Sequence, residues 1–126
     1  MKTDKIILVK EEQDLLKKHL KDMNLSIYNK TKLLSELEAA SIVKETDMPD
    51  DAIRIQSKVE IREKISGKKY DFQIVLPSQA NMKENKISVF APIGIALIGY
   101  RTGAKVQWEM PDGIKTFTVL NVRHNR

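Results

Sequence analysis

The residues of this chain that could do chemistry are few and scattered. The sequence has two histidines, His19 and His124, and no cysteine, so thiolate metal sites and disulfide bonds are excluded. Three carboxylates cluster at Asp47, Asp50 and Asp51, but their spacing lacks the closing glutamate of a calcium loop. No glycine-rich phosphate loop or recognisable nucleophile motif is present. These residues argue against an enzyme and predict no catalytic residue, no metal ligand and no cofactor.

Aromatic side chains could instead stack on the bases of a nucleic acid. Most of them fall at every second position of segments that resemble strands, which is typical of side chains on a buried face. We therefore interpret Tyr70, Phe72, Trp108 and Phe117 as core residues. Only Phe90 and Tyr100 remain as candidates for exposed aromatic residues.

Composition limits the class of protein further. A chain of 126 residues with 41% hydrophobic residues accommodates one domain, or one small domain with an appendage. The net charge of +5 is uneven, at −1 for residues 1–50 and +6 for residues 51–126. A solubilising surface explains this best, and weak nucleic-acid contact through the basic half, centred on residues 54–69, stays an alternative. The apolar run 6–9 is too short for a signal peptide or membrane span, which predicts a cytoplasmic protein without membrane contact.

The first half of the chain has the period of helices. After a short strand or lead-in at 5–9, apolar residues at helical spacing predict helices over 10–23 and about 30–44, joined by a turn at 24–29. Two amphipathic helices joined by a short turn should pack antiparallel as a hairpin. Residues 45–52, with Pro49 and three aspartates, are interpreted as a solvated linker.

The second half changes to a period of two, which indicates strands with one buried face. Pro92 suits the first position of a short helix, Gly99 suits its left-handed end, and Asp112-Gly113 predicts a hairpin turn. The predicted fold is therefore α+β, a helical hairpin followed by an antiparallel sheet with one short helix. We expect about five strands, within residues 53–62, 70–76, 86–90, 105–110 and 114–123.

One long stretch carries a family resemblance. Residues 87–99, Ile-Ser-Val-Phe-Ala-Pro-Ile-Gly-Ile-Ala-Leu-Ile-Gly, followed by Gly103, Val106, 111–113 and 119–122, resemble the C-terminal signature of the GreA/GreB transcript-cleavage factors. The resemblance implies an N-terminal helical hairpin (coiled coil) over residues 1–48 and an FKBP-like β domain over residues 49–126. It further implies a partner, bacterial RNA polymerase, with the β domain docked at the rim of the secondary channel and the hairpin pointing into it.

Two departures from the cleavage factors affect the expected activity. Those factors have a long hairpin whose tip carries a pair of acids that help to hold magnesium, whereas residues 21–30 contain a single acid, Asp22. They also have serine before the signature proline, where this chain has Ala91, which cannot cap a helix. With the Met48-Pro49 linker, the chain is more similar to the short-hairpin Rnk type, described as regulators of nucleoside diphosphate kinase, which bind polymerase without stimulating cleavage.

The resemblance places candidate residues at two sites. The turn expected to meet polymerase consists of Phe90, Ala91, Pro92 and Ile93. The expected hairpin tip includes Asp22, Asn24, Ser26 and Tyr28. The leading hypothesis is a monomeric, non-catalytic polymerase-binding factor that competes with GreA-type factors. The alternatives are a true cleavage factor that uses Asp22 and, less favoured, a basic nucleic-acid-binding domain.

Overall fold

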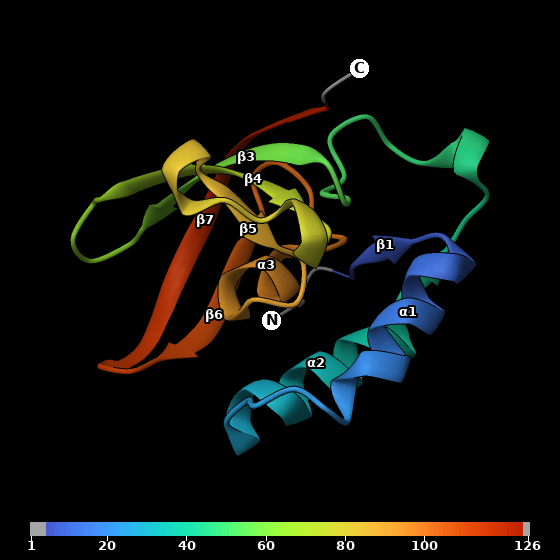
Figure 1. Cartoon of the computed structure of the whole chain (residues 1–126), viewed down its shortest axis with the longest axis horizontal. Coiled ribbons are helices and arrows are strands. Elements are labelled where there is room, and N and C mark those ends of the chain that lie inside the picture. The colour runs from blue at the N-terminus through green and yellow to red at the C-terminus, as the bar shows by residue number, and fades with distance from the viewer. Residues whose placement is uncertain (1–4, 125–126) are drawn as a thin grey trace.

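The computed structural model describes residues 5–124, which form helices and strands around a curled sheet (Figure 1). The fold therefore mixes helix and strand, as the sequence predicts. Three short 3-10 helices, Glu45–Asp47, Pro77–Gln79 and Met82–Glu84, lie in the connections. The main elements, in chain order, are β1 (Ile7–Leu8), α1 (Lys10–Leu20), α2 (Ile27–Ala39), β2 (Ser41–Ile42), β3 (Ser57–Glu63), β4 (Lys69–Val75), β5 (Lys86–Ser88), α3 (Pro92–Leu97), β6 (Lys105–Met110) and β7 (Gly113–His124).

Helices α1 and α2 lie side by side at one end of the molecule (Figure 1). Each presents a leucine stripe to the core, because residues three and four apart share one face of a helix. The amide of Gln13, near the start of α1, donates to the carbonyl of Leu37, near the end of α2, at 2.9 Å. Within residues 5–124 no helix has both the length and the apolar character needed to cross a membrane. The buried stripe consists of Leu16, Leu20, Leu33 and Leu37.

The helix boundaries differ from the sequence prediction. Helix α1 stops at Leu20, and α2 begins earlier than expected because the Ser26 hydroxyl accepts the backbone N–H of Asn29 at 3.1 Å and caps the helix. The second helix also ends before residue 44. Residues 41–42 instead form strand β2, which pairs in parallel with β1. The hydrogen-bond partners of β2 therefore come from a segment distant in sequence, which a local pattern does not reveal.

The five-stranded sheet has the order β5-β4-β3-β7-β6. The register pairs apolar residues of neighbouring strands with one another, so their side chains share the concave side of the curled sheet. The polar residues that alternate with them face the outer side. Helix α3 lies within this curl (Figure 1). The buried residues of the concave face include Val59, Ile61, Ile74, Val106, Trp108, Phe117, Val119 and Val122.

The prediction of an all-antiparallel sheet is wrong at one edge. Strand β5 pairs in parallel with β4, with Ile74 opposite Ile87. The connection 76–85 contains two 3-10 turns and carries the chain back along the sheet, so β5 runs in the same direction as β4. Strand β3 also begins later than expected, at Ser57, because Gln56 has a positive φ of 84° that interrupts extended structure. The β6–β7 turn is made by Pro111-Asp112, with Gly113 opposite Met110.

The helices are joined to the sheet by one continuous core. The backbone N–H of Ile7 donates to the carbonyl of Gly99 at 2.9 Å, which attaches β1 to the segment after α3. Gly99 has a φ of +88°, as the sequence predicts, and a Cβ there would lie 2.8 Å from the Cβ of Ile6. The buried cluster includes side chains from both sides of residue 48. The boundary between segments 1–48 and 49–126 stays a prediction.

Arg54 makes a second attachment. Its Nε donates to the carboxylate of Glu12 on α1 at 3.0 Å, and its Nη atoms bind the Glu45 carboxylate, with Nη2–Oε1 at 2.9 Å. Glu12 also accepts the N–H of Val9, the N-cap residue of α1. These contacts raise the pKa of Arg54, chiefly through the hydrogen bond to Glu45, and lower the pKa of Glu45. Arg54 therefore holds three segments together.

Candidate protein-docking site

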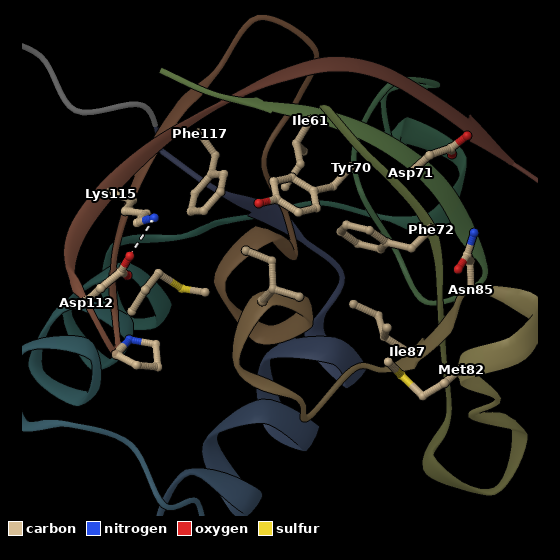
Figure 2. A pocket seen from close by; sticks show the side chains of 13 residues that line it. Ile61, Tyr70, Asp71, Phe72, Met82, Asn85, Ile87, Asp112, Lys115 and Phe117 are labelled. Atoms are coloured by element: carbon tan, nitrogen blue, oxygen red, sulfur yellow. Dashed lines mark ion pairs between the residues drawn. The ribbon is translucent and has the colours of Figure 1, made fainter. Parts of the chain in front are cut away.

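An apolar cavity of about 360 Å³ opens on the concave side of the sheet. Helix α3 is only six residues long, so it leaves part of the concave face uncovered. Figure 2 shows the rings of Tyr70, Phe72 and Phe117 directed into this space. The apolar residues around it include Ile61, Tyr70, Phe72, Ile87, Ile93, Met110 and Phe117.

The cavity mouth combines aromatic and flexible apolar side chains. Tyr70 and Phe117 meet edge to face, with ring centroids 6.4 Å apart, and the ammonium of Lys68 lies 5.3 Å from the Tyr70 centroid. Met82 is 80% exposed although it lines the cavity. Methionine adapts to the shape of what it contacts, so an exposed methionine beside aromatic rings is typical of a protein-binding surface.

A polar pair borders this apolar space. The ammonium of Lys115 lies 3.0 Å from the carboxylate of Asp112, across the mouth from Met82 in Figure 2. Their hydrogen bond lowers the pKa of Asp112 and raises the pKa of Lys115. Both groups therefore stay charged at neutral pH, and they could orient a partner whose apolar side chain enters the cavity.

The predicted docking turn joins this cavity on one side. The N–H of Phe90 donates to the Ser88 hydroxyl at 3.0 Å, and the N–H of Ala91 donates to the Ser88 carbonyl at 2.9 Å. Pro92 occupies the first helical position, as the sequence predicts, and its side chain is exposed. Ile93 lines the cavity, so it is the residue that connects the turn to the apolar surface.

Two features shape this turn beyond its sequence pattern. Ala91 is the N-cap residue of α3 and supplies no side-chain bond, as expected, and the Ser88 hydroxyl instead fixes the turn before the helix by accepting the N–H of Phe90. Gly94 is required for close approach, because a Cβ there would lie 2.5 Å from the carbonyl oxygen of Ser88. Phe90 turns away from the cavity and stacks on His19 of α1, with ring centroids 4.3 Å apart.

The predicted tip residues lie in or beside the connection between α1 and α2. Asp22 and Asn24 are exposed in this connection, Ser26 caps α2, and Tyr28 lies in its first turn. In the range 5–124 the structure brings together no group of three or more histidine and acidic side chains that could hold a metal ion. None of these four residues lines the cavity.

The sequence pattern missed several parts of the site. Tyr70, interpreted as core, is 39% exposed at the cavity mouth, whereas Tyr100, a candidate for exposure, is buried and donates its hydroxyl to Glu36. The contribution of Met82 could not be predicted, because only the fold of the 76–85 connection brings it to the sheet. His19 likewise showed no sign of its contact with Phe90. The alternation of strand residues did place Tyr70, Phe72 and Phe117 on one face.

Comparison with known proteins identifies the family. The family model described as "Transcription elongation factor, GreA/GreB, C-term" matches residues 48–124. The chain belongs to the GreA/GreB family. This match includes the sheet, the turn 90–93 and every residue named as lining the cavity.

Curated GreA/GreB relatives carry two kinds of name. The "Transcription elongation factor GreA" of Syntrophus aciditrophicus is 38% identical over 93 residues, which cover 74% of this chain and 58% of that protein. The "Regulator of nucleoside diphosphate kinase" of Escherichia coli K12 is 33% identical over 84 residues, 67% of this chain and 62% of that protein. The matches therefore span a little over half the length of these relatives.

Solved structures agree with the family assignment. The GreA/GreB factor from Nitrosomonas europaea aligns over 97% of this chain and 100% of its own, with a TM-score of 0.69 and 26% identity. The GreA factor homolog 1 protein of Thermus thermophilus aligns over 95% of this chain and 99% of its own, with a TM-score of 0.51. At 24% identity, this likeness concerns the fold alone. The resemblance to the GreA/GreB family is thus confirmed, and the relatives include one with the name expected of the Rnk type, a regulator of nucleoside diphosphate kinase.

Proposed function

We propose that this chain binds bacterial RNA polymerase and modulates transcription elongation without stimulating transcript cleavage. Its docking surface would consist of the turn 90–93 together with the apolar cavity mouth. Membership of the GreA/GreB family supports the choice of partner. The cavity carries the proposal, because an open apolar space of about 360 Å³ with an exposed methionine suits an apolar anchor of another protein.

The finer description of the fold belongs to the same proposal. We take α1 and α2 to be the short antiparallel hairpin of the family and the curled sheet to be its FKBP-like domain. The bond between Gln13 and Leu37 supports the antiparallel arrangement, since it joins the start of one helix to the end of the next. With the sheet docked at the rim of the secondary channel, the helices would point into the channel mouth.

A cleavage-free mode rests on the connection between the helices. Stimulated cleavage needs carboxylates to hold magnesium, and residues 21–26 contain only Asp22. The eleven residues of α1 rise by about 16 Å, which limits how far the tip could enter a channel. Competition with GreA-type factors requires only a shared docking surface and no chemistry at the tip.

The test measures binding to purified RNA polymerase core enzyme with a matched pair of variants. Met82→Asp puts a carboxylate at the cavity mouth, where docking would bury it. Ile65→Asp makes the same kind of change at a residue that is 92% exposed outside the cavity. Burying an unpaired charge costs several kcal/mol, so we expect at least about tenfold weaker binding by Met82→Asp and little change by Ile65→Asp. Equal effects of the two substitutions would exclude the cavity as the docking site.

Two further readouts distinguish the functional alternatives. The wild-type chain should displace a GreA-type factor from polymerase at micromolar concentrations, and failure to do so would contradict the shared docking surface. In backtracked elongation complexes it should stimulate no RNA cleavage. If cleavage does occur and is lost in Asp22→Asn, the chain is an active cleavage factor.

A further inference from the structure

The outer face of the sheet carries basic side chains that the register aligns. Arg62 on β3 pairs with Lys69 on β4 and with Thr118 on β7, and Thr118 pairs with Lys105 on β6. Directly paired residues point to the same side of a sheet, so these four form one row across four strands. Lys58 and Arg123 are also paired and begin a second basic row on the same face.

These basic groups are available to a ligand. Lys58, Arg62, Lys69, Lys105 and Arg123 are all exposed. Within residues 5–124 none of the five side chains forms an ion pair with a carboxylate. The acidic pair Glu60 and Asp71 lies between the two rows and lowers the positive potential without neutralising it.

The dimensions of the row suit a polyanion. Neighbouring strands lie about 4.8 Å apart, so the row from Lys69 to Lys105 spans about 14 Å. Duplex DNA carries one negative charge for each about 1.7 Å of its axis, so a surface of this length can meet several phosphates. Thr118 within the row and Asn121 beside Glu60 can add hydrogen bonds to phosphate oxygens.

The chemistry of this face favours a duplex over a single strand. Recognition of single strands depends on aromatic rings that stack on the bases. The aromatic rings of the sheet all lie on the concave face, because the residues that they pair with on neighbouring strands also face inward. These aromatic residues are Tyr70, Phe72, Trp108 and Phe117. A polar surface with cations and no aromatic ring contacts phosphates without reading the bases.

We propose that the outer face of this sheet binds the phosphate backbone of double-stranded DNA, independently of sequence. The docking cavity lies on the opposite, concave face, where α3 also lies (Figure 1). Both surfaces can therefore be occupied at once, and this inference does not depend on the proposed polymerase docking. The outer-face row is Lys69, Arg62, Thr118 and Lys105.

The experiment uses a fluorescein-labelled duplex of arbitrary sequence and measures anisotropy over a range of salt concentrations. Arg62→Gln, Lys69→Gln and Lys105→Gln together neutralise the row. Lys30→Gln, Lys44→Gln and Lys83→Gln together make the same change in net charge at exposed lysines outside the outer face. We expect a wild-type Kd on the order of 10⁻⁴ to 10⁻⁶ M, weakened at least about tenfold by the row variant. Its salt slope should fall by about one for each lost phosphate contact, whereas the control should keep most of its affinity and slope.

A second variant removes the acidic pair and should change DNA affinity in the opposite direction. Glu60→Gln with Asp71→Asn removes the carboxylates between the rows, so DNA affinity should rise several-fold. Equal losses in the row variant and the control would show that net charge alone attracts DNA, and would overturn the proposal. It would also be overturned by tighter binding of the single strand than of the duplex, or by no duplex binding at low salt.

Discussion

The imidazole of His19 stacks on the ring of Phe90, with centroids 4.3 Å apart and ring planes inclined by 21°. His19 belongs to α1, and Phe90 begins the turn that leads into α3. The His19 ring is held in turn by a contact of 3.0 Å between its Nδ1 and the Leu15 carbonyl. Helix α1 therefore positions one side of the proposed docking turn.

Loss of this stack should affect docking more than folding. Stacked rings contribute about 0.5–1.5 kcal/mol, so we expect His19→Ala to weaken polymerase binding by up to about tenfold if Phe90 must be held in place. His19→Phe keeps a stacking ring and should restore binding. Binding titrations with both variants check this prediction, and equal weakening by both would show that stacking is not what matters.

Asn29 closes one edge of the sheet. Its side-chain amide donates to the Glu109 carbonyl at 2.9 Å and accepts the Glu109 N–H at 2.8 Å, as a neighbouring strand would. Asn29→Ala should cost about 1–3 kcal/mol of unfolding free energy, because two backbone groups lose their partner. The midpoint of urea unfolding, followed by the fluorescence of the buried Trp108, measures this cost. The exposed control Asn24→Ala should unfold near the wild-type midpoint, and a similar loss there would contradict the interpretation.

Arg54 should stabilise the contact between the helices and the sheet. Its bond to Glu12 is largely buried, whereas the Lys10–Asp14 pair on α1 is mostly exposed. We expect Arg54→Gln to lower the unfolding free energy by about 1.5–3 kcal/mol, and Lys10→Gln by no more than about 0.5 kcal/mol. Urea unfolding of both variants tests the difference, which should persist at high salt. An equal, small effect of both would show that burial adds nothing.

Glu63 should make stability depend on pH. Its carboxylate accepts the N–H groups of Ile65 at 2.7 Å and Ser66 at 3.1 Å, which lower its pKa in the folded chain. The unfolded chain then binds the proton more readily, so this stabilisation is complete above about pH 4.3 and is lost as the pH falls through the folded pKa. Unfolding midpoints of wild type and Glu63→Gln should differ near neutral pH and converge in acid. A constant difference would refute this account of Glu63.

Local periodicity in the sequence predicted most of the helices and strands. The features that could not be predicted depend on pairing between segments that are distant in sequence. The alternation through Val106, Trp108 and Met110 identified a strand because its buried face depends only on neighbouring residues. The parallel direction of β5 depends on the path of the 76–85 connection, and β2 depends on a partner 34 residues earlier. Neither leaves a local pattern in the sequence.

The turn that leads into α3 could be predicted from the sequence, but the cavity beside it could not. The placement of Pro92 at the start of α3 follows from the chemistry of proline, which lacks the N–H that a helix start leaves unpaired. The cavity exists because the six-residue α3 reaches it only with Ile93, near the start of the helix, and leaves Tyr70 and Phe72 partly uncovered. Such a gap depends on the relative size of two elements in space, which periodicity does not report.

Photo-crosslinking at the cavity mouth tests the central claim most directly. A benzophenone amino acid in place of Met82, and in a second protein in place of Ile65, is irradiated in the presence of RNA polymerase core enzyme. Both positions are highly exposed in the free chain, at 80% and 92%, so a partner can reach either probe, and the two differ in what docks against them. We predict a crosslink to polymerase from position 82 and none above background from position 65. Crosslinking from position 65 alone would contradict docking through the cavity.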